Sequence, residues 1–419
     1  TTLTEYEINS KVVQEPLPRM KTYYKYVSDR VQAVVDKATA KNPSERYSSC
    51  EEFKKALHRA VYPRKMGVWA KIAIIVPIVL LLVAGVGAWD YFRVRVEYYK
   101  DYTERWGVPE GIGELSSKEH GRIHRSYKFY YQKGDLIRVS HVNSAGYMIS
   151  DGESERKERP IDQHFEYDKS GNVSRVVVKN ASGRVEYVKS YGVKNGKINK
   201  VVFQYDDEHG TERPISNHTV GYNQMLGSSD DQGLISRYAL TFDKNGFVKT
   251  EMFLSMDNSE VCDADGIYGR RYKRDEKGRP VEIHYIGKDE LPKATKWGLG
   301  IKKFEYDAND NWTRGIYLTI DELPAYDAKD GVSIYEMEYD ENGNIVYAIH
   351  KDGNGEVMYP KMNGIAGIRS TYDQFGNPVR QEYIDADRAV MFSTKNGLAY
   401  IDFEYDDRGF VVKQSSFDV

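Results

Sequence analysis

A short unit of the form aromatic-Asp-x-x-Gly recurs between residues 165 and 410. Clear copies are FEYDKSGN from Phe165, MEYDENGN from Met337 and FEYDDRGF from Phe403. The aspartates of all copies fall at 168, 206, 243, 275, 307, 340, 373 and 406, so the spacing tightens to 33 residues. A fixed period means that one supersecondary unit is repeated, and such units bury their apolar faces by stacking on their neighbours.

Each copy of the unit predicts a β-hairpin. Alternating aromatic residues such as Phe304 and Tyr306 are typical of a strand with one buried face. An aspartate that opens a turn caps the backbone N–H two residues on, and the glycine three residues later adopts a positive φ. The predicted turn residues are Asp168 and Gly171, Asp243 and Gly246, Asp307, Asp340 and Gly343, Asp373 and Gly376, and Asp406 and Gly409.

A return loop after each hairpin leads to the next one, so the pattern predicts an all-β antiparallel meander. We expect an elongated array rather than a closed globule, with regular repeats over about 160–419 in a domain that covers 107–419. Valine at Gly343 or Gly376 should cost roughly 1–3 kcal/mol through backbone strain. Glycine at Asp310, which has the same position in its turn, should be neutral or stabilising.

The repeated motifs resemble the YD repeats of bacterial surface and toxin proteins, over roughly 120–419. The proline- and glycine-rich terminal motif and the variable toxin domain of the large toxin-shell members are absent, so no toxin is inferred. Sugar binding, often suggested for such repeats, would need exposed tyrosine platforms. The alternative is that the 34 tyrosines pack the sheet.

The stretch 67–89 reads GVWAKIAIIVPIVLLLVAGVGAW and contains one charge, Lys71. Such a helix would cover the roughly 30 Å hydrocarbon core of a bilayer, with Trp69 and Trp89 at its two interfaces. The sequence therefore predicts a single-pass protein of the bacterial inner membrane, with the lipid bilayer as a partner. More Lys and Arg residues before the span than after it favour a cytoplasmic N-terminus and a periplasmic or extracellular C-terminal domain.

Residues 90–106 continue in a helical style, and we predict a juxtamembrane stalk there. Phe92, Val96, Tyr99, Thr103 and Trp106 follow the spacing of a heptad stripe. Small residues within the predicted span add a second dimerisation signal. Two interpretations remain open: a homodimer through the span and stalk, or a stripe that packs on the outer domain.

Residues 1–62 contain two short amphipathic helices around the loop NPSERY at 42–47. The stretches at 6–18 and 27–57 resemble the last part of the C-lobe of a bacterial Hanks-type serine/threonine protein kinase. In that family the arginine that matches Arg46 pairs with a glutamate near the end of the activation segment. The resemblance therefore implies a structural role for Arg46.

The motifs that make such a kinase active are missing. The chain has no glycine-rich phosphate loop with a strand lysine, no His-Arg-Asp loop and no Asp-Phe-Gly. We predict no catalytic, cofactor or metal residue here, and ATP and magnesium only for a full-length kinase. Since the chain begins Thr-Thr-Leu, we expect it to be the C-terminal part of a longer receptor kinase.

Lys and Arg (60) nearly balance Asp and Glu (63), so no overall field favours a nucleic-acid partner. The fold class predicted is multi-domain: a helical kinase remnant, a transmembrane helix and a β-repeat domain. The predicted function is the sensor and anchor half of a receptor kinase in signal transduction, whose outer repeats bind an unknown ligand or envelope component. The alternative is a membrane-tethered adhesion or envelope scaffold with a decayed kinase part.

Overall fold

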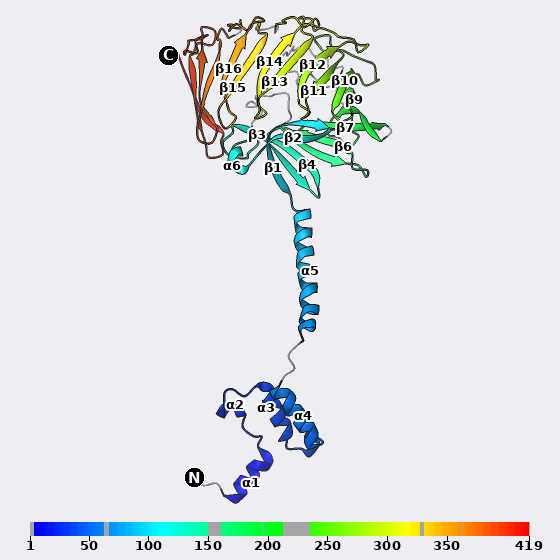
Figure 1. Ribbon diagram of the computed structural model, residues 1–419, viewed down its shortest axis with the longest axis vertical. Helices are drawn as coiled ribbons and strands as arrows, with labels where there is room; N and C mark the ends of the chain where they lie inside the picture. Colours follow the sequence, from blue (N-terminus) through cyan, green and yellow to red (C-terminus); the bar gives the residue numbers. More distant parts are fainter. Residues whose placement is uncertain are drawn as a thin grey trace. The chain divides into compact units, whose positions relative to one another are not determined.

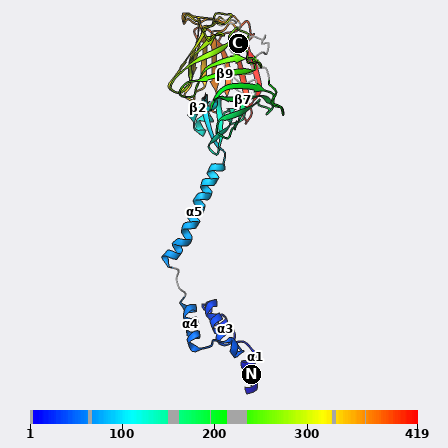
Figure 2. The ribbon, with the colours of Figure 1, turned by 90° about the vertical axis from the view of Figure 1, so that its right-hand side faces the viewer.

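The structure is a computed structural model that describes residues 4–62, 67–149, 161–194, 196–212, 235–326, 331–361 and 363–418. The chain divides into two compact units, Thr1–Asp90 and Tyr91–Val419. The first is helical and the second is built from β-strands, as Figures 1 and 2 show.

The first unit contains short helices joined by loops. Its elements are α1 (Glu5–Gln14), α2 (Met20–Tyr23), α3 (Asp29–Ala38), the 3-10 turn η1 (Pro43–Glu45), α4 (Cys50–Val61) and most of α5 (Val68–Phe92). Helix α3 begins at Ser28, whose hydroxyl accepts a hydrogen bond from Val31 N. Within residues 4–62, only Gln32 and Val34 are buried. These helices therefore have no core of their own comparable to that of a folded lobe.

Arg46 has a local role in this unit. Its Nε donates to Ala40 O at 2.7 Å, and its Nη2 lies 3.5 Å from Lys41 O. Asn42 caps the 3-10 turn by accepting from Ser44 N. The loop that resembled a kinase segment is thus accounted for by the hydrogen bonds of a tight turn between α3 and α4.

Helix α5 covers the apolar stretch for which a membrane span was predicted. Across the described residues, no helix combines the length and the apolar character of a membrane-crossing helix. The predicted transmembrane helix and the single-pass inner-membrane localisation are therefore wrong, whereas the lipid bilayer as a partner stays a prediction.

The second unit begins with a strand where a helical stalk was predicted. Strand β1 (Arg95–Arg105) pairs with β2 (Val108–Leu115) on one side and with β3 (Arg125–Gln132) on the other. Part of the predicted stripe packs inside the domain: Tyr99 contacts Phe129, with ring centroids 4.9 Å apart, and Thr103 is buried. The predicted stalk helix is wrong because this tyrosine-rich segment gains two strand partners. Phe92 and Val96 of the predicted stripe are exposed, and the homodimer stays a prediction.

The β-repeat part of the prediction agrees with the structure. After β3, every strand pairs antiparallel with the next one in sequence, so the order is β2-β1-β3-β4 and onward to β20. A short helix, α6 (Ser117–His120), lies between β2 and β3. The remaining strands are β4 (Asp135–Asn143), β5 (Asp162–Tyr167), β6 (Val173–Lys179), β7 (Val185–Lys194), β8 (Lys197–Gln204), β9 (Arg237–Phe242), β10 (Val248–Leu254), β11 (Gly269–Arg274), β12 (Pro280–Ile286), β13 (Ile301–Tyr306), β14 (Trp312–Leu318), β15 (Ile334–Tyr339), β16 (Ile345–Lys351), β17 (Gly367–Tyr372), β18 (Pro378–Ile384), β19 (Tyr400–Tyr405) and β20 (Val411–Phe417).

Tyrosines form much of the core of this domain, which favours packing over exposed platforms. Phe129, Phe203 and Phe253 are fully buried beside Tyr187 and Tyr285, each 2% exposed. Fully burying one large apolar side chain stabilises a fold by roughly 2 kcal/mol. The core joins β1 and β3 to the repeat strands as far as β14.

Five of the Asp turns of the repeats do not project freely, because they fold back onto residues 100–147, which we call the spine. Figure 1 shows β9 to β16 curving above β1 to β7. The hydrogen bonds are Trp106 N to Gly246 O (2.8 Å), Thr103 Oγ1 to Gly278 O (2.9 Å), Lys100 Nζ to Asn309 O (3.0 Å), His124 N to Asn344 Oδ1 (2.7 Å) and Asn143 Nδ2 to Arg408 O (2.7 Å). The prediction of an open, elongated array is therefore wrong, although neighbouring repeats do pair.

Candidate ligand pocket

Six aspartates of the repeat turns, at 168, 243, 307, 340, 373 and 406, each accept hydrogen bonds from two backbone N–H groups. One carboxylate oxygen accepts from the N–H two residues on and from the N–H four residues on, at 2.8 to 3.0 Å. The backbone N–H of Asn172 lowers the pKa of Asp168, and that of Phe410 lowers the pKa of Asp406. The turn residues at positive φ are Gly171 (81°), Gly246 (89°), Asp310 (67°), Gly343 (93°), Gly376 (78°) and Gly409 (77°).

Three tyrosines that directly precede a turn aspartate, Tyr339, Tyr372 and Tyr405, each link two repeats. Tyr339 Oη donates to Trp312 O at 2.5 Å, and Tyr372 Oη donates to Ile345 O at 2.7 Å. The acceptor is in both cases the first residue of the second strand of the preceding hairpin. Tyr405 makes the same bond to Pro378 O at 2.8 Å. These tyrosines are therefore fixed in orientation, which the sequence motif alone did not reveal.

Replacing Asp310 with glycine is expected to lower the free energy of unfolding by about 1 kcal/mol. Glycine relieves the left-handed strain, but Arg279 Nη1 donates to Asp310 Oδ1 at 2.7 Å, with both side chains less than 15% exposed. A hydrogen bond between charged groups contributes roughly 1.5–3 kcal/mol, so its loss outweighs the relief. This reverses the effect expected from the sequence.

The comparison for that substitution is Glu290→Gly, measured by guanidinium unfolding. Glu290 has a φ of 60°, close to that of Asp310, but its side chain is 52% exposed and its contact to Arg271 is 3.5 Å long. Glycine there should leave the midpoint unchanged or raise it. An equal rise for Asp310→Gly would show that the Arg279 contact does not stabilise the turn.

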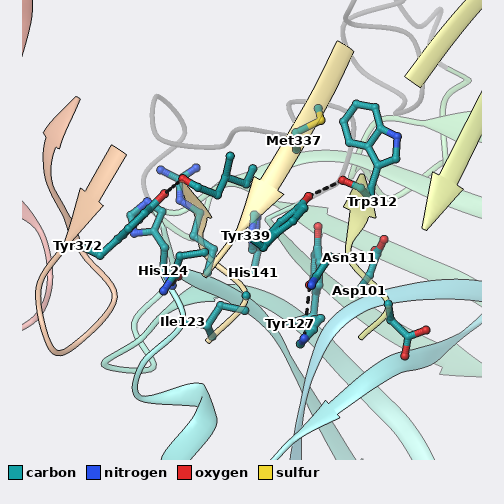
Figure 3. Close-up of a pocket in the computed structure, with 16 residues that line it drawn as sticks. Asp101, Ile123, His124, Tyr127, His141, Asn311, Trp312, Met337, Tyr339 and Tyr372 are labelled. Atoms are coloured by element: carbon teal, nitrogen blue, oxygen red, sulfur yellow. Dashed lines mark hydrogen bonds between the residues drawn. The ribbon is translucent and has the colours of Figure 1, made fainter. Parts of the chain in front are cut away.

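A cavity of about 260 Å³ lies where the spine meets the turns of three consecutive hairpins, β13–β14, β15–β16 and β17–β18. It is partly enclosed, and side chains from both sides meet in it, as Figure 3 shows. The spine contributes Lys100, Asp101, Ile123, His124, Arg125, Tyr127 and His141, and the repeats contribute Asp310, Asn311, Trp312, Met337, Tyr339, Gly343, Asn344, Ile345 and Tyr372.

The repeat wall of this pocket is preorganised. Tyr339 and Tyr372 are held by the hydroxyl bonds described above, so their rings have fixed positions. Asn311 is 8% exposed and Asn344 is 3% exposed, and each donates from Nδ2 to the aspartate four residues earlier. The repeated turns, which reverse the chain, therefore also position the side chains that form one wall of the pocket.

The spine wall contains two imidazoles with different surroundings. His141 stacks on Tyr127, with ring centroids 4.6 Å apart and an interplanar angle of 16°. His124 Nδ1 is buried and has no hydrogen-bond partner in the described part of the chain. Burial, with a smaller contribution from Arg125, lowers the pKa of His124 to about 3, so this imidazole is neutral at physiological pH.

The charged groups around the pocket are engaged within the protein. Lys100 Nζ donates to Asn309 O at 3.0 Å and lies 3.4 Å from Asn311 Oδ1. Asp310 pairs with Lys277 and Arg279. Asp101 and Arg125 also have interactions of their own. Over the described residues, no group of three or more His, Cys, Asp or Glu side chains has an arrangement that could hold a metal ion.

The turn residues predicted from the sequence lie around this pocket rather than in it. Asp307, Asp340 and Asp373 position the residues that follow them, and Gly343 alone of the predicted residues is part of the lining. Arg46 belongs to the other unit. The sequence analysis missed His124, His141, Tyr339 and Tyr372 as site residues, because the two histidines lie outside the repeats.

The return loops on the opposite edge carry a second periodic row of aromatic side chains. Tyr326, Tyr359 and Phe392 are 33 residues apart and 49%, 46% and 41% exposed. Tyr359 Oη accepts from Ala386 N at 3.0 Å and so connects neighbouring return loops. This row has a structural role, and it contains no buried polar atom that lacks a partner among the described residues.

Comparisons with known proteins leave the family open. No family model matches the chain, and neither does any curated protein. With no kinase match and no helical core, the interpretation of 1–62 as a kinase C-lobe remnant is wrong, and the receptor-kinase reading of the chain has no support.

Two solved structures show weak similarity. The crystal structure of TcdB2-TccC3-TEV matches at 11% identity and a TM-score of 0.21, covering 71% of this chain and 19% of that one. A porin-like protein from Bacteroides uniformis matches at 9% identity and a TM-score of 0.19, covering 77% of this chain and 93% of that one. Both TM-scores are far below 0.5, so neither likeness is used to infer function.

Proposed function

We propose that the β domain is a non-catalytic binding scaffold whose pocket between spine and repeats holds a small, uncharged, hydroxyl-bearing ligand. The repeats form the scaffold, since each antiparallel hairpin pairs with its neighbours and several of the turns are tied to the spine, as Asn344 is to His124. The observation that carries the proposal is the buried Nδ1 of His124, a residue that lines the pocket; this nitrogen has no partner among the described residues. Native proteins leave few buried polar atoms unsatisfied.

The chemistry of the pocket favours hydroxyl groups over charged ligands. A neutral imidazole offers either a donor or an acceptor at Nδ1, depending on its tautomer, and a hydroxyl can satisfy both. Lys100 and Asp310 already have partners, so an ionic ligand would have to displace existing contacts. The faces of Tyr339 and Tyr372 supply the apolar part that small-molecule sites combine with a few polar groups.

Isothermal titration of the full chain with glucose and N-acetylglucosamine as neutral ring probes tests this proposal, with glucuronate as the charged counterpart. A neutral probe should bind, and His124→Phe should weaken that binding roughly tenfold, because one hydrogen bond is lost. His209→Phe is the matched control, since His209 is exposed in a turn away from the pocket. His124 keeps one protonation state between pH 5 and 8, so this group should cause no change of affinity across that range.

Two outcomes would overturn the proposal. Binding of glucuronate without binding of either neutral probe would show that the pocket recognises a charge, and would replace the uncharged ligand with an anion. Equal binding by the wild type and by His124→Phe would show that the unpartnered Nδ1 is not a ligand contact.

A further inference from the structure

The first six residues of the β domain, 91–96, expose a cluster of apolar side chains. They read YFRVRV, so four of the six are aromatic or aliphatic. Tyr91 is 55% exposed, Phe92 56%, Val94 45% and Val96 39%. Single exposed apolar residues are ordinary on a protein surface, but an apolar cluster rimmed by polar groups marks a surface that meets a partner.

This segment is fixed on the domain by the turn between β3 and β4. Lys133 N donates to Tyr91 O at 3.2 Å, and Gln132 Nε2 donates to Phe92 O at 3.1 Å. From Arg95 onward the chain pairs with β3. The exposed apolar side chains therefore belong to a surface with a defined backbone.

The same surface carries an excess of cations. We call residues 91–96 together with the turn 132–135 the basic-aromatic patch. Its charged residues are Arg93, Arg95 and Lys133, against one acid, Asp135. Glu97 lies just beyond it and pairs with Arg95 at 3.2 Å. The whole chain has a net charge of −3, so the positive excess is a local property of the patch.

Two of these cations lie beside aromatic rings. Lys133 Nζ lies 5.3 Å from the centre of the Phe92 ring, and the Arg95 guanidinium lies 5.1 Å from that of Tyr131. The rings of Tyr91 and Phe92 meet edge to face, with centroids 5.2 Å apart. Aromatic rings and long basic side chains with apolar stems are typical of protein surfaces at the boundary between lipid headgroups and acyl chains.

We infer that the basic-aromatic patch docks on the surface of an anionic lipid bilayer. The side chains of Tyr91 and Phe92 enter the interfacial region, and the cations contact the negatively charged headgroups. This docking is peripheral, so it requires no segment that crosses the bilayer. It is also separate from the ligand pocket, because no residue of the patch lines that pocket.

Size and charge favour a lipid surface over the other occupants. A stable protein–protein interface takes roughly 20–30 residues from each side, whereas the patch has ten. Binding to a lipid surface instead increases with the apolar area inserted and with the attraction of charges. In a symmetric dimer formed through this patch, the cations of the two copies would approach each other. Like charges destabilise such an interface, whereas anionic headgroups neutralise them.

Site-specific fluorescence of the full chain tests the docking, in a background where the exposed Cys50 and Cys262 are replaced by serine. Phe92→Cys is labelled with NBD, a dye whose emission depends on polarity, and vesicles of equal parts phosphatidylcholine and phosphatidylglycerol are added. The emission should shift to the blue, and it should shift much less with phosphatidylcholine alone. Phe375→Cys is the matched control, since Phe375 is 54% exposed but lies in the turn between β17 and β18. Its emission should not change.

Charge variants of the labelled chain test what attracts the lipid. Arg93→Glu with Lys133→Glu should raise the vesicle concentration for a half-maximal shift by roughly tenfold or more, because attraction to the headgroups is lost. Lys244→Glu with Lys395→Glu changes the net charge equally at exposed positions outside the patch, and it should have little effect.

Three results would overturn the inference. The first is an unchanged emission at Phe92→Cys, or an equal change at Phe375→Cys. The second is a blue shift that Arg93→Glu with Lys133→Glu leaves intact, because an anionic surface would then not be what the patch recognises. The third is a blue shift that appears without vesicles as the protein concentration rises, which would assign the patch to a second copy of the chain.

Discussion

Replacing Gly376 with valine is expected to destabilise the β domain by on the order of 4 kcal/mol, through strain and overlap together. Gly376 has a φ of 78°, which a β-branched residue adopts only with strain. A Cβ atom at this position would also lie 2.4 Å from Arg122 O and 2.8 Å from Ile123 C, both in the backbone of the spine. A backbone atom cannot rotate away as a side chain can, so the turn would have to leave the spine.

Gly171→Val separates the two contributions. Gly171 has the same place in its turn and a φ of 81°, but nothing lies within 4 Å of a Cβ built on it. It should therefore cost only the strain of roughly 1–3 kcal/mol. Guanidinium unfolding gives the difference, and hydrogen exchange should show lost protection near Arg122 in the Gly376 variant alone. If Gly376→Val and Gly171→Val lowered the free energy of unfolding equally, a side chain at 376 would not clash with the backbone of the spine.

Replacing Arg270 with alanine is expected to cost about 3–5 kcal/mol, because it leaves a buried carboxylate without its cation. The Arg270 side chain is 3% exposed, and its Nη1 donates to Glu251 Oε1 at 2.7 Å. Tyr272 Oη donates to the same oxygen at 2.8 Å. The guanidinium also lies 5.0 Å from the centre of the Phe253 ring, so packing is lost together with charge.

Two further variants show whether the buried charge is the cause. The double variant Arg270→Met with Glu251→Leu removes both charges and should recover most of the stability, because an apolar pair can replace a buried ion pair. Lys413→Ala breaks a pair whose side chains are 60% and 62% exposed, and it should change stability by less than about 1 kcal/mol. A double variant as unstable as Arg270→Ala would assign the loss to packing instead. Unfolding midpoints in guanidinium give all of these values.

The parts of the fold that the sequence predicted are those governed by local chemistry. Asp307 and its backbone donors are at most four residues apart, so the residues of one copy of the motif determine the geometry of its turn. Neighbouring hairpins pair for the same reason, since a strand after a short turn has its partner beside it. The second bond, from the N–H four residues on, was missed because the expectation considered a simple four-residue turn.

The pocket and the spine could not be predicted because their contacts join distant residues. Asn143 and Arg408 are separated by 265 positions, and Thr103 and Gly278 by 175. The residues outside the repeats show no periodicity, so nothing in the sequence indicated that His124 would lie near Tyr372. The stalk was misread because spacings of three and four residues suggested a helix and left out Tyr102, which is 4% exposed in the core.

The apolar stretch at 67–89 illustrates a different limit. Hydropathy along the chain predicted a span, whereas among the described residues no helix is both long and apolar enough to cross a membrane. The kinase reading of the N-terminal segment had a similar weakness, since it rested on a loop motif. A motif of six residues that closes a turn by itself, as Arg46 does with Ala40, gives little information about the rest of a fold.

The position of the spine has a consequence for the order in which the domain folds. Synthesis runs from the N-terminus, so residues 100–147 leave the ribosome before any of the turns that they bind. Hairpins close within roughly 1–10 μs, but contacts between distant residues form slowly because a long loop must first be closed. The bond from Asn143 to Arg408 cannot form until the turn at 406–410 has emerged. Until then the spine lacks the turn residues to which it will bind. During this interval a nascent chain of this kind is most accessible to chaperones and proteases.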